Sequence, residues 1–346
     1  MRIDPKTVVG GVLAFAFLLT VLQSLGLAPS AAAAGTSLSS WAVDGPLPVT
    51  EPDSALWADA VPLALPLSAQ IMITPTQKNP TVDAIEVRSL NNGTHIAFRI
   101  RWPDATKDAY TTTTQQFRDA VAIQVGAQSD VPYLCMGGAN ARMNILQWKA
   151  DWQADIEEGF HDLQDEFPNF WVDYYPYAIG GPPYEVPAQF PENASLYLVG
   201  YTVGNPFSQP LKVTPVEDAL AYGFFTITTG VRQDALGWGE WRDGAWTVVI
   251  ARALDTGDPQ DNAIGRNNAL AFAVWDGGNE DRGSRKSTTG WVPLGVQAVR
   301  STAVDPLVVT AIILIAVPIV VLVLRRLEAR NEPMRIPEER KEPGKP

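Results

Sequence analysis

Apolar and polar residues alternate with a period of two along much of this chain, which is the pattern of half-buried β-strands. In residues 94–102 the apolar side chains fall on one face, and His95 and two arginines fall on the other. Similar alternation, or an apolar run of strand length, predicts further strands at 84–90, 119–126, 144–149, 196–203, 223–228, 245–252 and 269–275.

Turn-forming residues separate these segments. Asp243-Gly244, between Trp241 and Trp246, is typical of a two-residue β-hairpin. The acidic stretch 152–170 predicts a short helix, and the proline-rich stretch 171–195 predicts a long ordered loop. These patterns together predict an all-β fold, an antiparallel β-sandwich with long loops and a short helix.

The two ends of the chain have the composition of membrane-directed segments. A basic start, an apolar run and an alanine-rich exit predict a signal peptide or N-terminal anchor over residues 1–34. Residues 306–324 carry no charge, are long enough for a transmembrane helix and precede Arg325-Arg326. We therefore expect a linker at 35–56, an extracytoplasmic domain at 57–300 and a cytoplasmic tail at 325–346, held at the cell membrane by one or two spans.

Charge and cysteine content narrow the function. The formal net charge of −12 argues against a nucleic-acid-binding protein, which needs a basic surface. The negative charge forms either a solvated acidic surface or a field that steers a cationic soluble partner, such as a small basic cytochrome. The single cysteine, Cys135, excludes intrachain disulfides, cysteine-ligated iron–sulfur clusters and covalent haem attachment through two cysteines.

Common catalytic motifs are absent from the sequence. It contains no Gly-x-Ser-x-Gly elbow, phosphate-binding loop or His-Glu-x-x-His motif. The two histidines, His95 and His161, lie in polar surroundings and are expected at the surface. We therefore predict no catalytic residue.

Three stretches of the central domain, in this order, resemble motifs of one protein family. The stretch 131–151 places Met136 before two glycines and ends in Trp148-Lys149-Ala150-Asp151, the stretch 214–228 contains Val-Glu-Asp, and the stretch 275–287 ends in Lys-Ser. They are similar to motifs in the haem-binding gamma subunits of ethylbenzene and dimethylsulfide dehydrogenases and of chlorate and selenate reductases. The resemblance covers about residues 55–295, although Phe225 stands where the family commonly has glycine.

The resemblance implies one noncovalent haem b held between a methionine sulfur and a lysine amine. Met136 matches the methionine, and Lys212, just before the Val-Glu-Asp run, is the expected lysine, with Lys149 as the alternative. Trp148 and Asn144 are expected to contribute to haem binding. A thioether favours ferrous iron, and a lysine must lose its proton to bind iron, so burial must lower its pKa.

The resemblance also implies a function and partners. It indicates a membrane-anchored b-type cytochrome subunit, itself non-catalytic, that relays electrons for a molybdopterin oxidoreductase of the DMSO-reductase family. Its partners would be the molybdopterin catalytic subunit, an iron–sulfur subunit, and a quinol pool or soluble cytochrome. The C-terminal anchor departs from the usually soluble members and is closer to the archaeal cytochromes b558/566. The alternative is an anchored β-sandwich without haem that binds carbohydrate or mediates adhesion through exposed tryptophans.

Overall fold

The computed structural model describes residues 37–126, 136–138, 141–167, 169–170, 177–181, 184–187, 189–266, 268–299 and 314. The chain divides into two units, Met1–Val299 and Arg300–Pro346. The expected segments 1–34 and 325–346 lie outside the described residues, as does 306–324 apart from Leu314. No helix within the described residues has the length and apolarity needed to cross a membrane.

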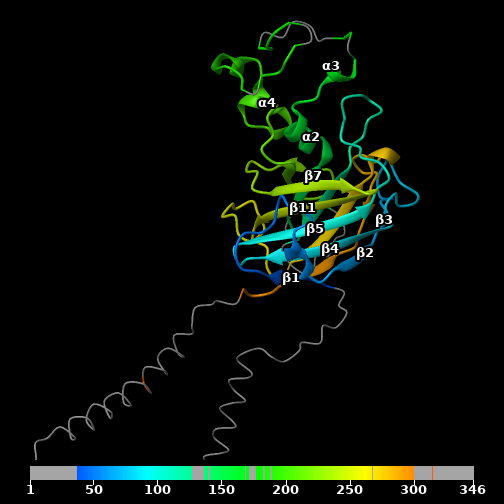
Figure 1. Cartoon of the computed structure of the whole chain (residues 1–346), viewed down its shortest axis with the longest axis vertical. Helices are drawn as coiled ribbons and strands as arrows, with labels where there is room; N and C mark the ends of the chain where they lie inside the picture. The colour runs from blue at the N-terminus through cyan, green and yellow to red at the C-terminus, as the bar shows by residue number, and fades with distance from the viewer. Residues whose placement is uncertain are drawn as a thin grey trace, which may run out of the picture. The chain divides into compact units, whose positions relative to one another are not determined.

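Strands dominate the first unit, and its helices are short (Figure 1). The described strands are β1 (Leu38–Ala42), β2 (Leu63–Pro66), β3 (Ser68–Ala69), β4 (Ala84–Asn91), β5 (His95–Pro103), β6 (Ala120–Val125), β7 (Met143–Lys149), β8 (Val216–Ala221), β9 (Thr228–Thr229), β10 (Leu236–Arg242), β11 (Ala245–Ala253), β12 (Ala269–Trp275), β13 (Ser287–Thr288) and β14 (Val292–Val296). The described α-helices are α2 (Ala150–Glu158), α3 (Leu163–Glu166) and α4 (Val199–Thr202), and the 3-10 helices are η1 (Ala55–Ala58), η2 (Glu192–Leu196), η3 (Pro206–Ser208) and η4 (Gly277–Asn279).

The strands form one continuous mixed sheet in the order β10-β11-β5-β4-β1-β14-β12-β6-β7-β8-β9. The sheet folds back on itself, so that β5 and β11 share one buried core with β6, β7 and β12. Most neighbours are antiparallel, but β1 runs parallel to both β4 and β14. The expected β-rich sandwich is therefore confirmed, and the expectation of a purely antiparallel arrangement is corrected. β1 also lies within residues 35–56, so part of the expected linker belongs to the sheet.

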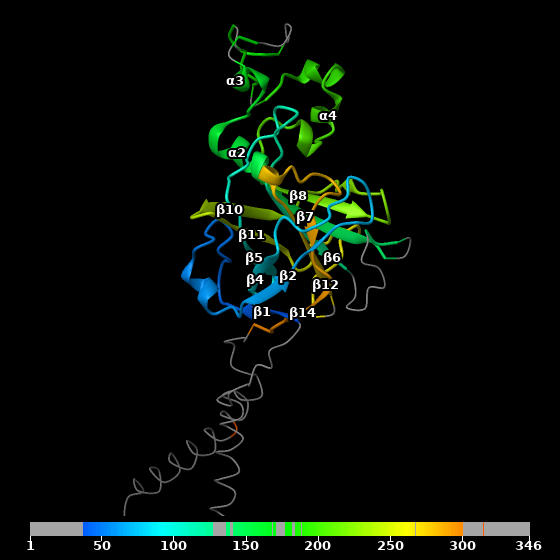
Figure 2. The same ribbon diagram turned by 90° about the vertical axis from the view of Figure 1, so that its right-hand side faces the viewer.

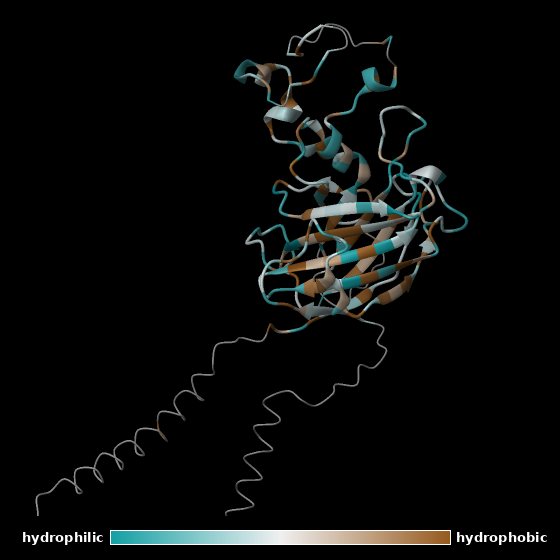
Figure 3. Ribbon diagram, in the orientation of Figure 1, coloured by the Kyte–Doolittle hydropathy of each residue, from teal (hydrophilic) through white to brown (hydrophobic). Residues whose placement is uncertain are grey.

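Three tryptophans from different strands meet in the core. Trp102 of β5, Trp148 of β7 and Trp246 of β11 are fully buried, and their ring centroids lie 4.8–6.5 Å apart. Gly239 of β10 lies against the Trp148 indole, where a Cβ atom would overlap the ring. Hydrophobic and hydrophilic positions alternate along the strands (Figure 3), as expected where one face of each strand is buried.

Most of the predicted strands are present. Those at 84–90, 94–102, 119–126, 144–149, 245–252 and 269–275 correspond to β4, β5, β6, β7, β11 and β12. The predicted hairpin is confirmed, because Asp243 and Gly244 connect β10 to β11 with φ values of 53° and 71°, the left-handed region that a type I′ turn requires.

Two predicted strands are wrong. Residues 196–203 contain the end of η2 and helix α4; this segment lies beyond the sheet, where no strand edge pairs with it and local helical hydrogen bonds form instead. At 223–228 only the last residue enters a strand, β9. Gly223 and Phe225 have φ values of 146° and 61°, which interrupt an extended run.

The described residues of 150–213 form a lobe that projects from the end of the sandwich opposite β1 (Figures 1 and 2). It contains α2, α3, η2, α4 and η3, so the predicted short helix at 152–170 corresponds to two helices. Trp152 of α2 and Phe207 of η3 pack edge to face with ring centroids 5.1 Å apart. We call this part of the chain the lobe.

Candidate functional site

Strand β7 carries different chemistry on its two faces. Leu146 and Trp148 belong to the main core, whereas Met143 and Ile145 belong to a second apolar cluster on the other face. Because side chains alternate along a strand, Lys149 points to the same side as Met143 and Ile145. The first sequence motif thus supplies both the core and a separate surface of the sheet.

Small side chains cover that second face where β12, β6, β7 and β8 lie next to one another. Ala120 and Ala122 come from β6 and Ala219 and Ala221 from β8, and all four are almost fully buried. Met136, Ala141, Ala273 and Trp291 pack against this cluster, which also includes Met143, Ile145 and Trp275. We call this surface the alanine face; it is apolar, and four of its seven buried residues are alanines.

Met136 reaches the alanine face because of the tight turn that follows it. Gly137 has a φ of 79°, and a Cβ atom there would overlap the Ala141 carbonyl oxygen and press on Met143. Gly138 then forms an isolated bridge with Ala141. Glycine at position 137 is therefore a geometric requirement of the turn that follows Met136. Residues 127–135 and 139–140, on either side of this turn, lie outside the described residues.

Lys286 also borders the alanine face, and sequence reasoning did not select it. It precedes β13, which pairs with the end of β12, and its Nζ lies 4.8 Å from the centre of the Trp275 ring. Burial lowers the pKa of Lys286 from 10.5 to about 8. No carboxylate or hydrogen-bond acceptor in the described part of the chain pairs with this amine. The sequence feature that could have indicated Lys286 is its position in the third motif, eleven residues after Trp275.

Lys149 lies at the far end of β7 in a polar and aromatic environment. Its Nζ forms an ion pair with Glu217 and lies 3.9 Å from the ring centre of Trp152 and 4.2 Å from that of Phe207. Burial lowers the pKa of Lys149 to about 8, although Glu217 opposes the change. Six residues separate it from Met143, about 20 Å along an extended strand.

Lys212 lies on the other side of Trp152. Its Nζ donates to the Gln209 carbonyl oxygen and lies 3.6 Å from Asp155 Oδ2. Burial lowers the pKa of Lys212, and the Asp155 carboxylate raises it in part. Among the described residues, none that contacts Lys212 Nζ also packs against Met136. The structure thus brings Lys212 close to Lys149, around Trp152. The turn after Met136 lies at the Met143–Ala221 end of the alanine face, whereas Lys286 lies against Trp275, which pairs with Ala120 and so stands level with Lys149 at the other end.

Trp148 and Asn144 lie on the opposite side of β7 from the alanine face. The Trp148 indole Nε1 donates to Gln153 Oε1 at 2.9 Å, inside the tryptophan core. Asn144 donates to Asp261 Oδ1 at 2.6 Å and accepts from the Asn262 backbone N–H at 2.7 Å. Both residues fix β7 and a neighbouring loop, and the structure does not bring them to the surface that Met136 contacts.

The fold and the site define a class of protein, a β-sandwich subunit with the donor atoms of a haem-binding domain. A thioether and a weakly basic amine border one apolar face, and both are suitable ligands for haem iron. The sequence model of one family, described as ethylbenzene dehydrogenase, matches residues 54–287. The chain belongs to this family.

One curated relative is provisionally named respiratory nitrate reductase heme subunit ORF7, from Haloferax mediterranei. It is 23% identical over 244 residues, which cover 70% of this chain and 66% of the relative. The match therefore spans just under two thirds of that protein's length. The family and the name of this relative both support the expected cofactor, haem.

Solved structures with a weaker likeness are carbohydrate-binding proteins. A family 9 carbohydrate-binding module from Caldicellulosiruptor kristjanssonii, in complex with glucose, is 9% identical with a TM-score of 0.34, covering 78% of this chain and 100% of the module. A protein provisionally described as carbohydrate-binding, from Bacteroides uniformis, is 9% identical with a TM-score of 0.40, covering 75% of this chain and 99% of that one. Similarity at this level carries no argument about ligands.

Proposed function

We propose that this protein is a b-type cytochrome subunit that relays electrons for a molybdopterin oxidoreductase. The observation that carries the proposal is the alanine face, bordered by the Met136 thioether and, beside Trp275, by a Lys286 amine that has no partner among the described residues. Small apolar side chains allow a flat ring system to approach the sheet closely. A haem held there would supply a one-electron carrier, and two protein ligands would leave no iron position open for a substrate.

We favour Lys286 over Lys212 and Lys149 as the second ligand, because a ligating lysine must be neutral. Lys149 and Lys212 each have a carboxylate partner, Glu217 and Asp155, that stabilises the protonated form. Lys286 has no such partner among the described residues, and burial alone accounts for its lowered pKa. Use of Lys286 as a ligand would therefore break no ion pair among the described residues, whereas Lys149 and Lys212 would each have to leave a carboxylate.

The partners and location follow from the same proposal. The family and the relative named as a nitrate reductase subunit support a place in a molybdoenzyme complex. We propose a molybdopterin catalytic subunit and an iron–sulfur subunit as partners, exchanging electrons with a quinol pool or a soluble cytochrome. The apolar segment 306–324 and the basic pair after it would hold the sandwich outside the cytoplasmic membrane.

Reduced-minus-oxidised spectra of the purified full-length protein test this function. We expect a b-type α-band in the wild type, loss of haem or a high-spin spectrum in Met136→Ala and Lys286→Ala, and no change in the exposed controls Met72→Ala and Lys78→Ala. Lys212→Ala and Lys149→Ala complete the set. If one of these removes the low-spin spectrum while Lys286→Ala keeps it, our assignment of the second ligand is wrong but the haem function remains.

A wild-type protein purified without haem, and unable to bind added haemin, would overturn the function itself. The carbohydrate-binding alternative needs exposed tryptophans as a platform. Among the described tryptophans only Trp41 is exposed, whereas those at 57, 102, 148, 152, 246 and 275 are buried and those at 238, 241 and 291 are half-buried. Their position in the core agrees with packing rather than with sugar binding.

A further inference from the structure

The lobe combines unbalanced acidic charge with exposed apolar side chains. Residues 150–213 contain ten Asp and Glu residues and a single Lys or Arg, Lys212, which is buried. Eight large side chains among the described residues of the lobe are more than half exposed, namely Ile179, Leu196, Tyr197, Val199, Val203, Phe207, Leu211 and Val213. Apolar surface of this density, bordered by charge, is typical of a binding surface.

These side chains border a hollow of about 370 Å³ that we call the lobe groove. Its walls include Phe160, Val186, Phe190, Tyr197 and Phe207. Exposed carboxylates adjoin the wall residues along the chain, namely those of Glu158, Glu185 and Glu192. The groove therefore has apolar walls, and we call the exposed carboxylates that lie next to these walls in the sequence its acidic rim.

The lobe groove connects to the end of β7 through one aromatic ring. Phe207 lines the groove, and its ring centre also lies 4.2 Å from Lys149 Nζ and 5.1 Å from the centre of the Trp152 ring. Lys149 ends the strand whose outward side chains form part of the alanine face. A molecule seated in the groove would thus lie beyond the end of the strand that contributes to the proposed haem face.

We propose that the lobe groove is the docking surface for a soluble redox protein with a basic rim around an apolar patch. The redox character of this partner rests on the proposed function, whereas its charge and apolarity follow from the groove. A second copy of this chain would oppose like charges at the rim, and an anionic lipid surface would be repelled by the same carboxylates. Opposite charge at the rim mainly accelerates encounter, and the apolar centre holds the complex.

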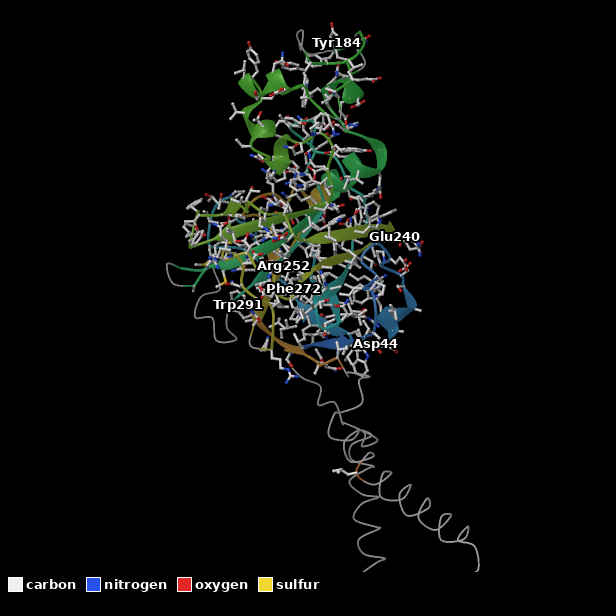
Figure 4. The ribbon with its side chains drawn as sticks, turned by 90° about the vertical axis from the view of Figure 1, so that its left-hand side faces the viewer. Asp44, Tyr184, Glu240, Arg252, Phe272 and Trp291 are labelled. Atoms are coloured by element: carbon white, nitrogen blue, oxygen red, sulfur yellow. The ribbon has the colours of Figure 1, made fainter. Side chains whose placement is uncertain are left out.

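Binding of mitochondrial cytochrome c, a small basic redox protein, tests the proposal. The immobilised full-length protein is titrated with cytochrome c at low and high ionic strength, in the wild type and in the double variant Glu185→Lys/Glu192→Lys. The matched control is Asp44→Lys/Glu51→Lys, which adds the same charge at exposed positions near β1. Figure 4 shows Asp44 and Tyr184, the neighbour of Glu185, at opposite ends of the unit.

We expect salt-sensitive binding that the lobe variant weakens about fivefold and the control changes by less than about twofold. Val199→Ser, at the wall of the groove, should weaken binding equally at low and high salt. Equal effects of the two charge reversals would mean attraction by net charge alone and would overturn the proposal. Absence of binding would overturn it too, as would self-association or phosphatidylglycerol-vesicle binding that the lobe variant abolishes. The assay needs no haem spectrum, so its failure is distinct from failure of the proposed function.

Discussion

Replacing Lys286 by methionine should make the haem-free protein more stable. The Lys286 amine lies against Trp275 without a charged partner among the described residues, and burial lowers its pKa from 10.5 to about 8. A factor of ten in a protonation equilibrium corresponds to about 1.4 kcal/mol, so the folded state is destabilised by about 3 kcal/mol when this lysine is protonated. Methionine has a similar length and shape and removes that penalty.

The stabilisation that Lys286→Met gives depends on pH. Below pH 8 the lysine is protonated in both the folded and the unfolded chain, and the folded state carries the full penalty. Between pH 8 and 10.5 the folded protein loses its proton first, so the stability of the wild type rises. The advantage of Lys286→Met is therefore greatest at neutral pH and absent above about pH 10.5.

Urea unfolding of haem-free protein, followed by tryptophan fluorescence at pH 7 and pH 10, measures this difference. Lys78→Met, at an exposed position, serves as the control and should change the free energy of unfolding by less than about 0.5 kcal/mol. A Lys286→Met protein that is no more stable than the wild type at pH 7, or equally stabilised at both pH values, would refute the reasoning. Under the proposed function the same variant should lose the amine-ligated haem spectrum, so stability and function would change in opposite directions.

Two further predictions concern the framework behind the site. Gly239→Ala should destabilise the fold by about 2 kcal/mol or more in urea unfolding, because its Cβ would overlap the buried Trp148 ring. The control Gly290→Ala, at a position with open space around it, should leave the free energy of unfolding unchanged. Asp119 accepts from Trp246 Nε1 and from the Gly277 N–H, and burial, with the Asp104 charge, raises its pKa to about 8. Ionisation of Asp119 destabilises the folded wild type as the pH rises, whereas asparagine at this position does not ionise. The stability lost in Asp119→Asn relative to the wild type should therefore shrink between pH 5 and pH 9, and a loss that is constant with pH would contradict this.

The part of the fold that follows from local pattern could be predicted from the sequence. Alternating residues identified the strands that build the core, and Asp243-Gly244 identified the hairpin, because both signals depend on a few adjacent residues. β1 was missed, since a serine-rich segment becomes a strand only when β4 and β14 are both present to pair with it. The exposed apolar residues 196–203 of the lobe were wrongly predicted as a strand. The sequence alone does not show whether a neighbouring strand is available to pair with them.

The candidate site could be predicted in part. The Met-Gly-Gly turn and the family motifs led to Met136, which packs against the alanine face; its role as a haem ligand stays a prediction. The lysine could not be chosen from sequence alone, because burial and the absence of a carboxylate partner are tertiary properties. Lys286 acquires them only when β13 pairs with β12 and places it beside Trp275.

The position of β1 between β4 and β14 also determines when the protein can finish folding. Leu38 pairs with Leu294, near the other end of the described part of the first unit. During synthesis or export, the edge of β1 that pairs with β14 therefore stays unpaired until almost the entire sandwich has emerged. Unpaired strand edges invite aggregation, so a newly made chain is most vulnerable until its last strand arrives.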